Sequence, residues 1–168
     1  MMDQCQRIDP PYAAGEKEMV TAFLDWQRAT LLCKLAGLSD EQLRWRHQPS
    51  GLSLLWLVKH LGVVEQFWFR LIYAGEIATP GDWNEFWRHE AVAPDETAAD
   101  VIGFYEEQVE HSRRITTAAA FDDAARNPRP REQGLTLRWL LLHMIEETAR
   151  HNGHVDLIRE PLDGLTGE

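Results

Sequence analysis

The chain has 168 residues, which is enough for one domain with its own core and too few for two ordinary domains. Hydrophobic residues make up 44% and charged residues 26%, a balance that excludes a disordered or fibrous protein. The formal net charge of −10 argues against nucleic acid as a partner, because a polyanion would be repelled. No apolar run approaches the ~20 residues of a membrane span, and the polar start does not resemble a secretory signal, so we expect a cytoplasmic protein without membrane contact.

Helical periodicity organises the first half of the chain. After a loose polar tail over residues 1–14, we expect an amphipathic helix over 16–36 that ends before a glycine. A capping box over 39–42 predicts a short helical turn. A serine then begins a long helix over 53–73 that is apolar on most faces, which is typical of a helix at the centre of a fold.

The second half alternates irregular segments with helices. Residues 77–96 lack a clear period and contain proline and glycine, so we expect a long ordered loop with one helical turn. A third helix is expected over 97–119, followed by a proline-containing linker over 122–134. A threonine begins a fourth helix over 136–159, and residues 160–168 are expected to form a loose tail.

Four long helices without strand-period alternation predict an all-α fold. The architecture that we expect is a four-helix bundle with short extra helical turns, forming a single domain over residues 1–168. Bundles build metal and ligand sites from side chains on facing helices. Polar residues on the inward-facing stripes are therefore the candidates for function.

His60 is the polar member of the inward stripe of the second long helix. The other positions at the same helical spacing are Trp56, Leu57, Leu61, Val64, Phe67, Trp68 and Leu71. A buried imidazole needs a hydrogen bond, a charge or a metal as its partner. The pattern alone leaves two interpretations open, a hydrogen-bonded core histidine and a metal ligand.

The fourth helix carries Glu147 and His151 on its inward stripe, four residues apart. At ~1.5 Å rise per residue their Cα atoms lie about 6 Å apart on one face, so both side chains can bind one ion. His143 and His154 flank this pair. Together with His60, the pair would give two nitrogens and one oxygen with a fourth position open, the set of a catalytic Zn²⁺ site, although Ni²⁺, Fe²⁺ or Mn²⁺ would also accept it. An ion pair at the rim of the bundle is the alternative.

The remaining histidines and tryptophans have simpler interpretations. His47, His89 and His111 have polar neighbours in the sequence and are expected to face solvent. The tryptophans are expected to pack in the core and loops, and Trp83 and Trp87 could cover the mouth of a pocket. The chain has two cysteines, too few for a disulfide framework.

Three segments give the sequence a family resemblance. The segments PSGLSLLWLVKHLGVVEQFWF (49–69) and LRWLLLHMIEETARHNGHVDLIRE (137–160) resemble the two metal-bearing helices of the DinB-like superfamily. The opening helix, EMVTAFLDWQRATLLCKLAGLSDEQ, is also similar. The likeness is closest to the actinobacterial branch, which includes mycothiol-dependent maleylpyruvate isomerase and the mycothiol and bacillithiol S-transferases.

The resemblance implies a ligand set. In the superfamily, a histidine of the second helix and a pair four residues apart on the fourth helix hold a divalent metal, which corresponds to His60, Glu147 and His151 here. Many members have histidine at the position of Glu147, whereas the mycothiol-dependent isomerase has glutamate there and binds zinc. Many relatives read His-Arg-Gly-Gln where this chain reads His151-Asn152-Gly153-His154, so the resemblance transfers no role to His154.

The resemblance also implies an activity, that of a metal-dependent thiol S-transferase. A low-molecular-weight thiol such as mycothiol would bind the metal as thiolate and attack an electrophilic carbon, with His143 or His154 beside the ligands handling a proton. Hydrolysis by metal-bound water is an enzymatic alternative, which turnover without added thiol would favour. A metal-binding protein without catalysis is the third hypothesis. The expected partners are a small-molecule thiol and an electrophile, and a homodimer is left open.

Overall fold

The computed structural model describes residues 6–48 and 50–165, and over these residues the predicted all-α class is confirmed. The chain divides into two compact units, a first unit of residues 1–57 and 141–168 and a second unit of residues 58–140. Within the described part of the chain, we find no helix that combines the length and the apolar character needed to cross a membrane.

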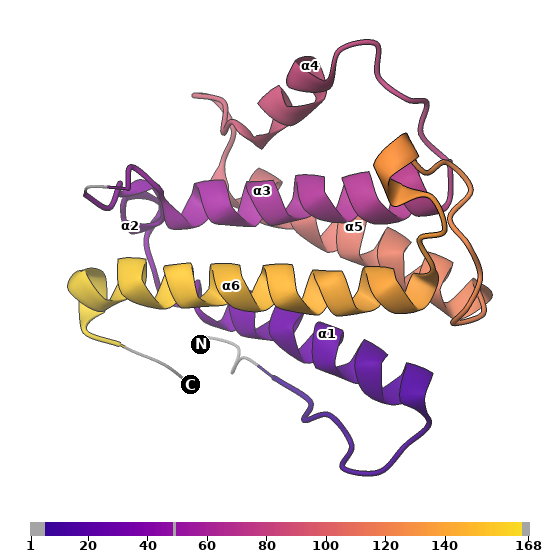
Figure 1. Cartoon of the computed structure of the whole chain (residues 1–168). Helices are drawn as coiled ribbons and strands as arrows, with labels where there is room; N and C mark the ends of the chain where they lie inside the picture. The colour runs from indigo at the N-terminus through magenta and orange to yellow at the C-terminus, as the bar shows by residue number, and fades with distance from the viewer. Residues whose placement is uncertain (1–5, 49, 166–168) are drawn as a thin grey trace. The chain divides into compact units, whose positions relative to one another are not determined.

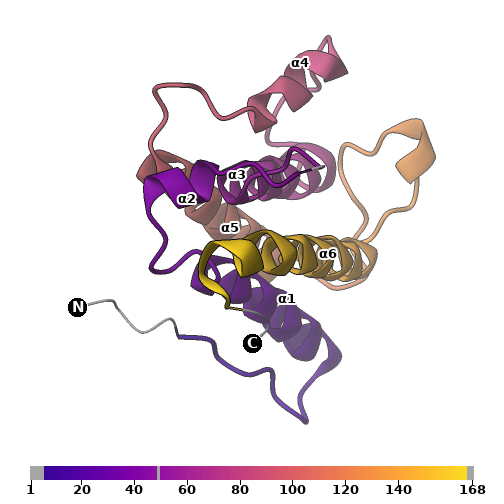
Figure 2. The same ribbon diagram turned by 90° about the vertical axis from the view of Figure 1, so that its left-hand side faces the viewer.

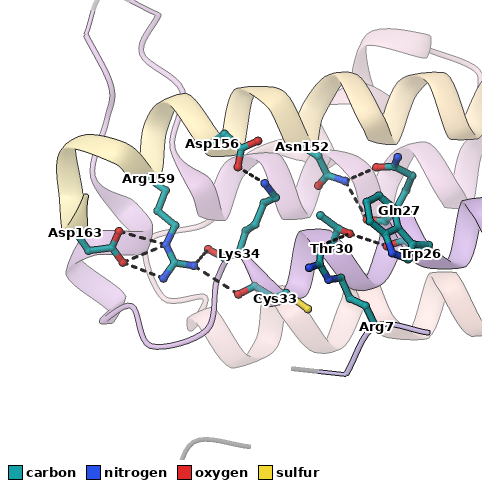
Figure 3. Close-up of polar contacts among 10 residues, drawn as sticks. All are labelled: Arg7, Trp26, Gln27, Thr30, Cys33, Lys34, Asn152, Asp156, Arg159 and Asp163. Atoms are coloured by element: carbon teal, nitrogen blue, oxygen red, sulfur yellow. Dashed lines mark hydrogen bonds and ion pairs between the residues drawn. The ribbon is translucent and has the colours of Figure 1, made fainter. Parts of the chain in front are cut away.

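The first unit contains α1 (Glu16–Cys33), α2 (Asp40–Arg44) and most of α6 (Leu137–Asp163). Helices α1 and α6 lie side by side and run in the same direction (Figures 1 and 2). Figure 3 shows the polar contacts that join them, in which Asn152 donates to the backbone oxygen of Gln27 at 3.0 Å and Lys34 pairs with Asp156. The capping box predicted at α2 is confirmed between Ser39 and Gln42.

The ends of two helices differ from the predicted bounds. Helix α1 ends at Cys33, three residues early, because residues 34–37 form turns that end on Gly37 with φ of 85°. Helix α6 continues past Arg159 and through Pro161 to Asp163, where an ion pair of 2.9 Å between Arg159 and Asp163 supports the last turn. Cys33 is disulfide-bonded. The other cysteine, Cys5, lies outside the described residues.

The second unit contains α3 (Leu54–Glu65) from residue 58 onward, and this helix continues directly into the π-helix η1 (Gln66–Tyr73). The extent predicted for this helix is therefore confirmed, but its last two turns are wider than those of an α-helix. Helix α5 (Ala98–Ala118) packs against it in the same direction (Figures 1 and 2). The packing is close at Gly62, where an added Cβ would lie 2.8 Å from the ring of Phe104.

The loop predicted over 77–96 contains α4 (Trp83–Trp87) and the 3₁₀ turn η2 (Arg88–Glu90). Phe86 of α4 is buried, and its ring lies 5.8 Å from that of Phe67 on η1. The short helix is thereby fixed to η1 by aromatic packing. A further 3₁₀ turn, η3 (Pro130–Glu132), lies in the predicted linker before α6.

Candidate functional site

Glu147 and His151 meet on a mostly buried face of α6. The helix forms because residues 137–160 are rich in good helix formers, and its fully buried side chains are apolar at Leu137, Leu140, Leu141, Met144 and Val155. Among them, the Glu147 side chain is only 15% exposed and His151 is buried. Oε1 of Glu147 lies 3.2 Å from Nε2 of His151, so the two donor atoms face each other one helical turn apart.

Both side chains of this pair are held in place from their other sides. Oε2 of Glu147 accepts a hydrogen bond of 2.8 Å from Arg150, which also pairs with Glu146. Nδ1 of His151 lies 3.2 Å from Nδ1 of His154. These contacts leave Oε1 of the carboxylate and Nε2 of the imidazole directed at each other.

The contact between His151 and His154 is compatible with a neutral His154. Burial lowers the pKa of His154 below its ordinary value, and the neighbouring His151 and Arg150 lower it further, against the opposing effect of Glu147. A neutral His154 can accept a hydrogen bond at Nδ1. His151 can then donate from Nδ1 and keep the lone pair of Nε2 for a ligand on the side of Glu147.

His143 lies one turn before Glu147 and is half-buried. Its Nδ1 is 3.5 Å from Oε2 of Glu146. Burial lowers the pKa of His143, Glu147 partly opposes this effect, and Arg150 adds to it. The imidazole is therefore neutral at neutral pH and available to accept a proton.

His60 belongs to α3, in the second unit. Its side chain is 15% exposed, between the buried residues Leu57 and Leu61. Nδ1 of His60 lies 3.1 Å from Oε1 of Glu90 in η2, within ion-pair distance but poorly aligned for a hydrogen bond. The carboxylate of Glu90 thus occupies the Nδ1 side of the imidazole.

Glu90 is the residue of this region that the sequence analysis missed. It lies 30 residues after His60, in a segment without helical period, so no local pattern connects the two. The buried aromatic packing of Phe86 on Phe67 holds α4, and η2 follows it directly. That packing depends on tertiary contacts, which the spacing of residues in the sequence does not reveal.

The other predicted surface and loop residues occupy ordinary positions. His89 is exposed, whereas His111 is partly covered with its Nε2 3.7 Å from Glu107. Trp87 packs on Phe67, with ring centroids 5.0 Å apart. Trp83 contacts the same ring and also lines a cavity of about 360 Å³ beside residues 127–130, so it does border a pocket.

Comparison with known proteins gives one family. The family model described as mycothiol-S-transferase matches residues 19–164, which is most of the chain. No curated protein matches the sequence. Because the match covers well over half of the residues, the chain belongs to the mycothiol S-transferase family.

Proposed function

We propose that the protein is a metal-dependent S-transferase, which joins a low-molecular-weight thiol such as mycothiol to an electrophilic carbon. The family supplies the thiol and the type of transfer. The observation that carries the metal dependence is the contact of Glu147 with His151 on a mostly buried helix face. Arg150 pairs with Oε2 of Glu147, whereas Oε1 of Glu147 and Nε2 of His151 face each other away from it, and a divalent cation could bind both of these atoms.

The proposed ligands are His60, Glu147 and His151. Two imidazoles and one carboxylate have the donor chemistry of a metal site. Three protein ligands with one open position suit catalytic Zn²⁺, which is our first expectation, with Ni²⁺, Fe²⁺ and Mn²⁺ as alternatives. A bound divalent cation lowers the pKa of a coordinated thiol, so that thiolate is present at neutral pH.

The neighbouring residues of α6 are proposed to orient the ligands and to move a proton. Arg150 holds the outer oxygen of Glu147, and His154 holds the outer nitrogen of His151. In the transfer, a bond forms between the thiol sulfur and the electrophilic carbon, and the leaving group departs with its electron pair. The thiol proton passes to a base, and His143 is our assignment for that role. The proposed compartment is the cytoplasm.

The test combines metal analysis with thiol transfer in two variants. Purified protein loaded with Zn²⁺ is expected to hold one equivalent of metal, to lose thermal stability when a chelator is added, and to transfer mycothiol to monochlorobimane. His60→Ala is expected to abolish bound metal and transfer. The exposed His89 serves as the control, and His89→Ala should change neither.

Each alternative predicts a different result. Stoichiometric metal in His60→Ala would remove His60 from the ligand set. Turnover of an ester or amide without thiol, and none with it, would favour the hydrolase. Bound metal with inertness toward thiols and electrophiles would favour a metal-binding protein, and a chain that holds no metal would refute the proposal.

A further inference from the structure

The second unit contains a cavity of about 520 Å³ with two tryptophan walls. Trp68 of η1 and Trp139 of α6 provide the walls, with ring centroids 5.5 Å apart and ring planes inclined by 54°. The segment 131–136, drawn in orange before α6 in Figure 1, lines the rest. This volume lies within the roughly 300–1,000 Å³ of small-molecule sites.

The exposure of Trp139 favours a ligand with an apolar surface. Its side chain is 48% exposed although it lines a concave site and contacts a second indole. Tryptophan has the largest apolar surface of any residue, and the faces of two inclined indoles suit a flat ring that stacks on one and meets the other with its edge. A ring of that kind would cover apolar area that now faces water.

The charges around the cavity further limit the chemistry of the ligand that it would bind. Glu132 is a lining residue, but Arg129 and Arg131 both bond its carboxylate, with Arg131 Nε 3.2 Å from Oε1. The two arginines therefore neutralise the carboxylate of Glu132, so the cavity does not need a cationic ligand. The guanidinium of Arg131 is largely exposed and lines the cavity, so its N–H groups can donate hydrogen bonds to acceptor substituents on the ring, such as nitro or carbonyl oxygens.

The cavity is also connected to the proposed metal ligands through the helices that build it. Trp68 lies eight residues after His60 along α3 and η1, and Trp139 lies eight residues before Glu147 along α6. Each of the two ligand-bearing helices thus supplies one wall. We propose that the cavity lined by Trp68 and Trp139 binds the aromatic ring of an electrophilic substrate. As a statement about the substrate, this inference rests on the proposed function.

The binding test uses 1,3-dinitrobenzene, an aromatic probe without a leaving group, in both metal-loaded and chelated protein. We expect it to shift the indole N–H resonances of Trp68 and Trp139 and to bind at least severalfold more tightly than cyclohexanone. Trp139→Leu should weaken binding about tenfold because the stacking face is lost, whereas Trp139→Phe should retain most of the affinity. The control is Trp45→Leu, which removes another exposed indole and should leave the affinity unchanged.

The result that would overturn the inference is an unchanged dissociation constant in Trp139→Leu, or shifts confined to other tryptophans. If Trp139→Leu does not fold, the affinity of Trp139→Phe and the indole N–H shifts of the wild-type protein still test the inference. Metal uptake and ring binding are measured separately and so distinguish the two proposals. Ring binding by a protein that takes up no Zn²⁺ when loaded would refute the metal site alone, and Zn²⁺ binding without ring binding would refute this inference alone.

Discussion

Removal of the Glu90 carboxylate is expected to weaken metal binding through His60. Both side chains are mostly buried, and 3.1 Å separates Nδ1 of His60 from Oε1 of Glu90. A carboxylate in this position keeps the ring proton on Nδ1 and the lone pair on Nε2, and it restrains rotation of the ring. Loss of such a partner typically reduces metal affinity by roughly 10- to 100-fold.

The geometry places the expected effect at the lower end of that range. The contact between His60 and Glu90 is close but not aligned as a straight hydrogen bond, so orientation contributes less than charge. We therefore expect Glu90→Gln to weaken Zn²⁺ binding about tenfold, equivalent to about 1.4 kcal/mol. Glu85→Gln, an exposed change on α4, is the matched control and should have no effect.

Competition with a chelating dye measures the affinity, and ¹⁵N resonances of His60 report its tautomer in metal-free protein. The expected spectrum has the proton on Nδ1 in the wild type and a mixture of tautomers in Glu90→Gln. An affinity within twofold of the wild type, or a wild-type His60 with its proton on Nε2, would refute the reasoning.

Three further predictions concern stability, each measured as the free energy of unfolding in urea. Gly62→Ala should destabilise the protein by about 1–3 kcal/mol because the added Cβ meets α5. Gly103→Ala, with open space around it, should stabilise the protein by up to about 1 kcal/mol. A change of the same sign in both variants would contradict the packing at Gly62. Arg159→Ala should lower the free energy of unfolding by about 2 kcal/mol, because Arg159 donates hydrogen bonds to backbone carbonyls at the end of α1. Arg44→Ala, which removes an exposed ion pair, should lower it by about 0.5 kcal/mol or less. Similar losses in the two variants would contradict this difference. For Glu132, burial raises the pKa, but hydrogen bonds from its arginine partners outweigh it and hold the pKa below the ordinary 4.5. Its contribution should be present above pH 4.5 and lost as the pH falls through the lower folded value, and Glu132→Gln should flatten this decline.

The sequence predicts those features that depend on residues close together in the chain. The capping box at Ser39 is confirmed because such a box involves residues three apart, and α5 begins with a box of the same kind at Thr97. The meeting of Glu147 with His151 has the same local origin, since residues four apart on a helix share a face.

The features that the sequence does not predict depend on tertiary packing or on subtle helix energetics. The contact of His60 with Glu90 joins two segments 30 residues apart, and tertiary contacts bring them together, among them the aromatic packing of α4 and the hydrogen bond from Lys59 to the backbone oxygen of Ala91. The π-helical turns of η1 have no compositional signal. The predicted end of α6 at residue 159 is too early, because Pro161 lies in the last turn, where it removes only one backbone hydrogen bond and the ion pair of Arg159 with Asp163 supports the turn.

The contact between Glu147 and His151 has two interpretations, a metal-binding pair and a structural ion pair, and its surroundings favour the first. An ion pair needs a cationic His151, and its contact with His154 fits either interpretation, because Nδ1–H is a donor in the cationic ring and in one tautomer of the neutral ring. Arg150 already supplies a cation to the outer oxygen of Glu147, so the carboxylate does not depend on a cationic His151 for its charge compensation. Two donor atoms 3.2 Å apart, each supported from behind, are instead an arrangement that a divalent ion completes by binding both. The two interpretations separate in Glu147→Gln, which retains the shape of the side chain. Loss of metal with little change in the stability of chelated protein would support the ligand role, and equal destabilisation with and without chelator would support the ion pair.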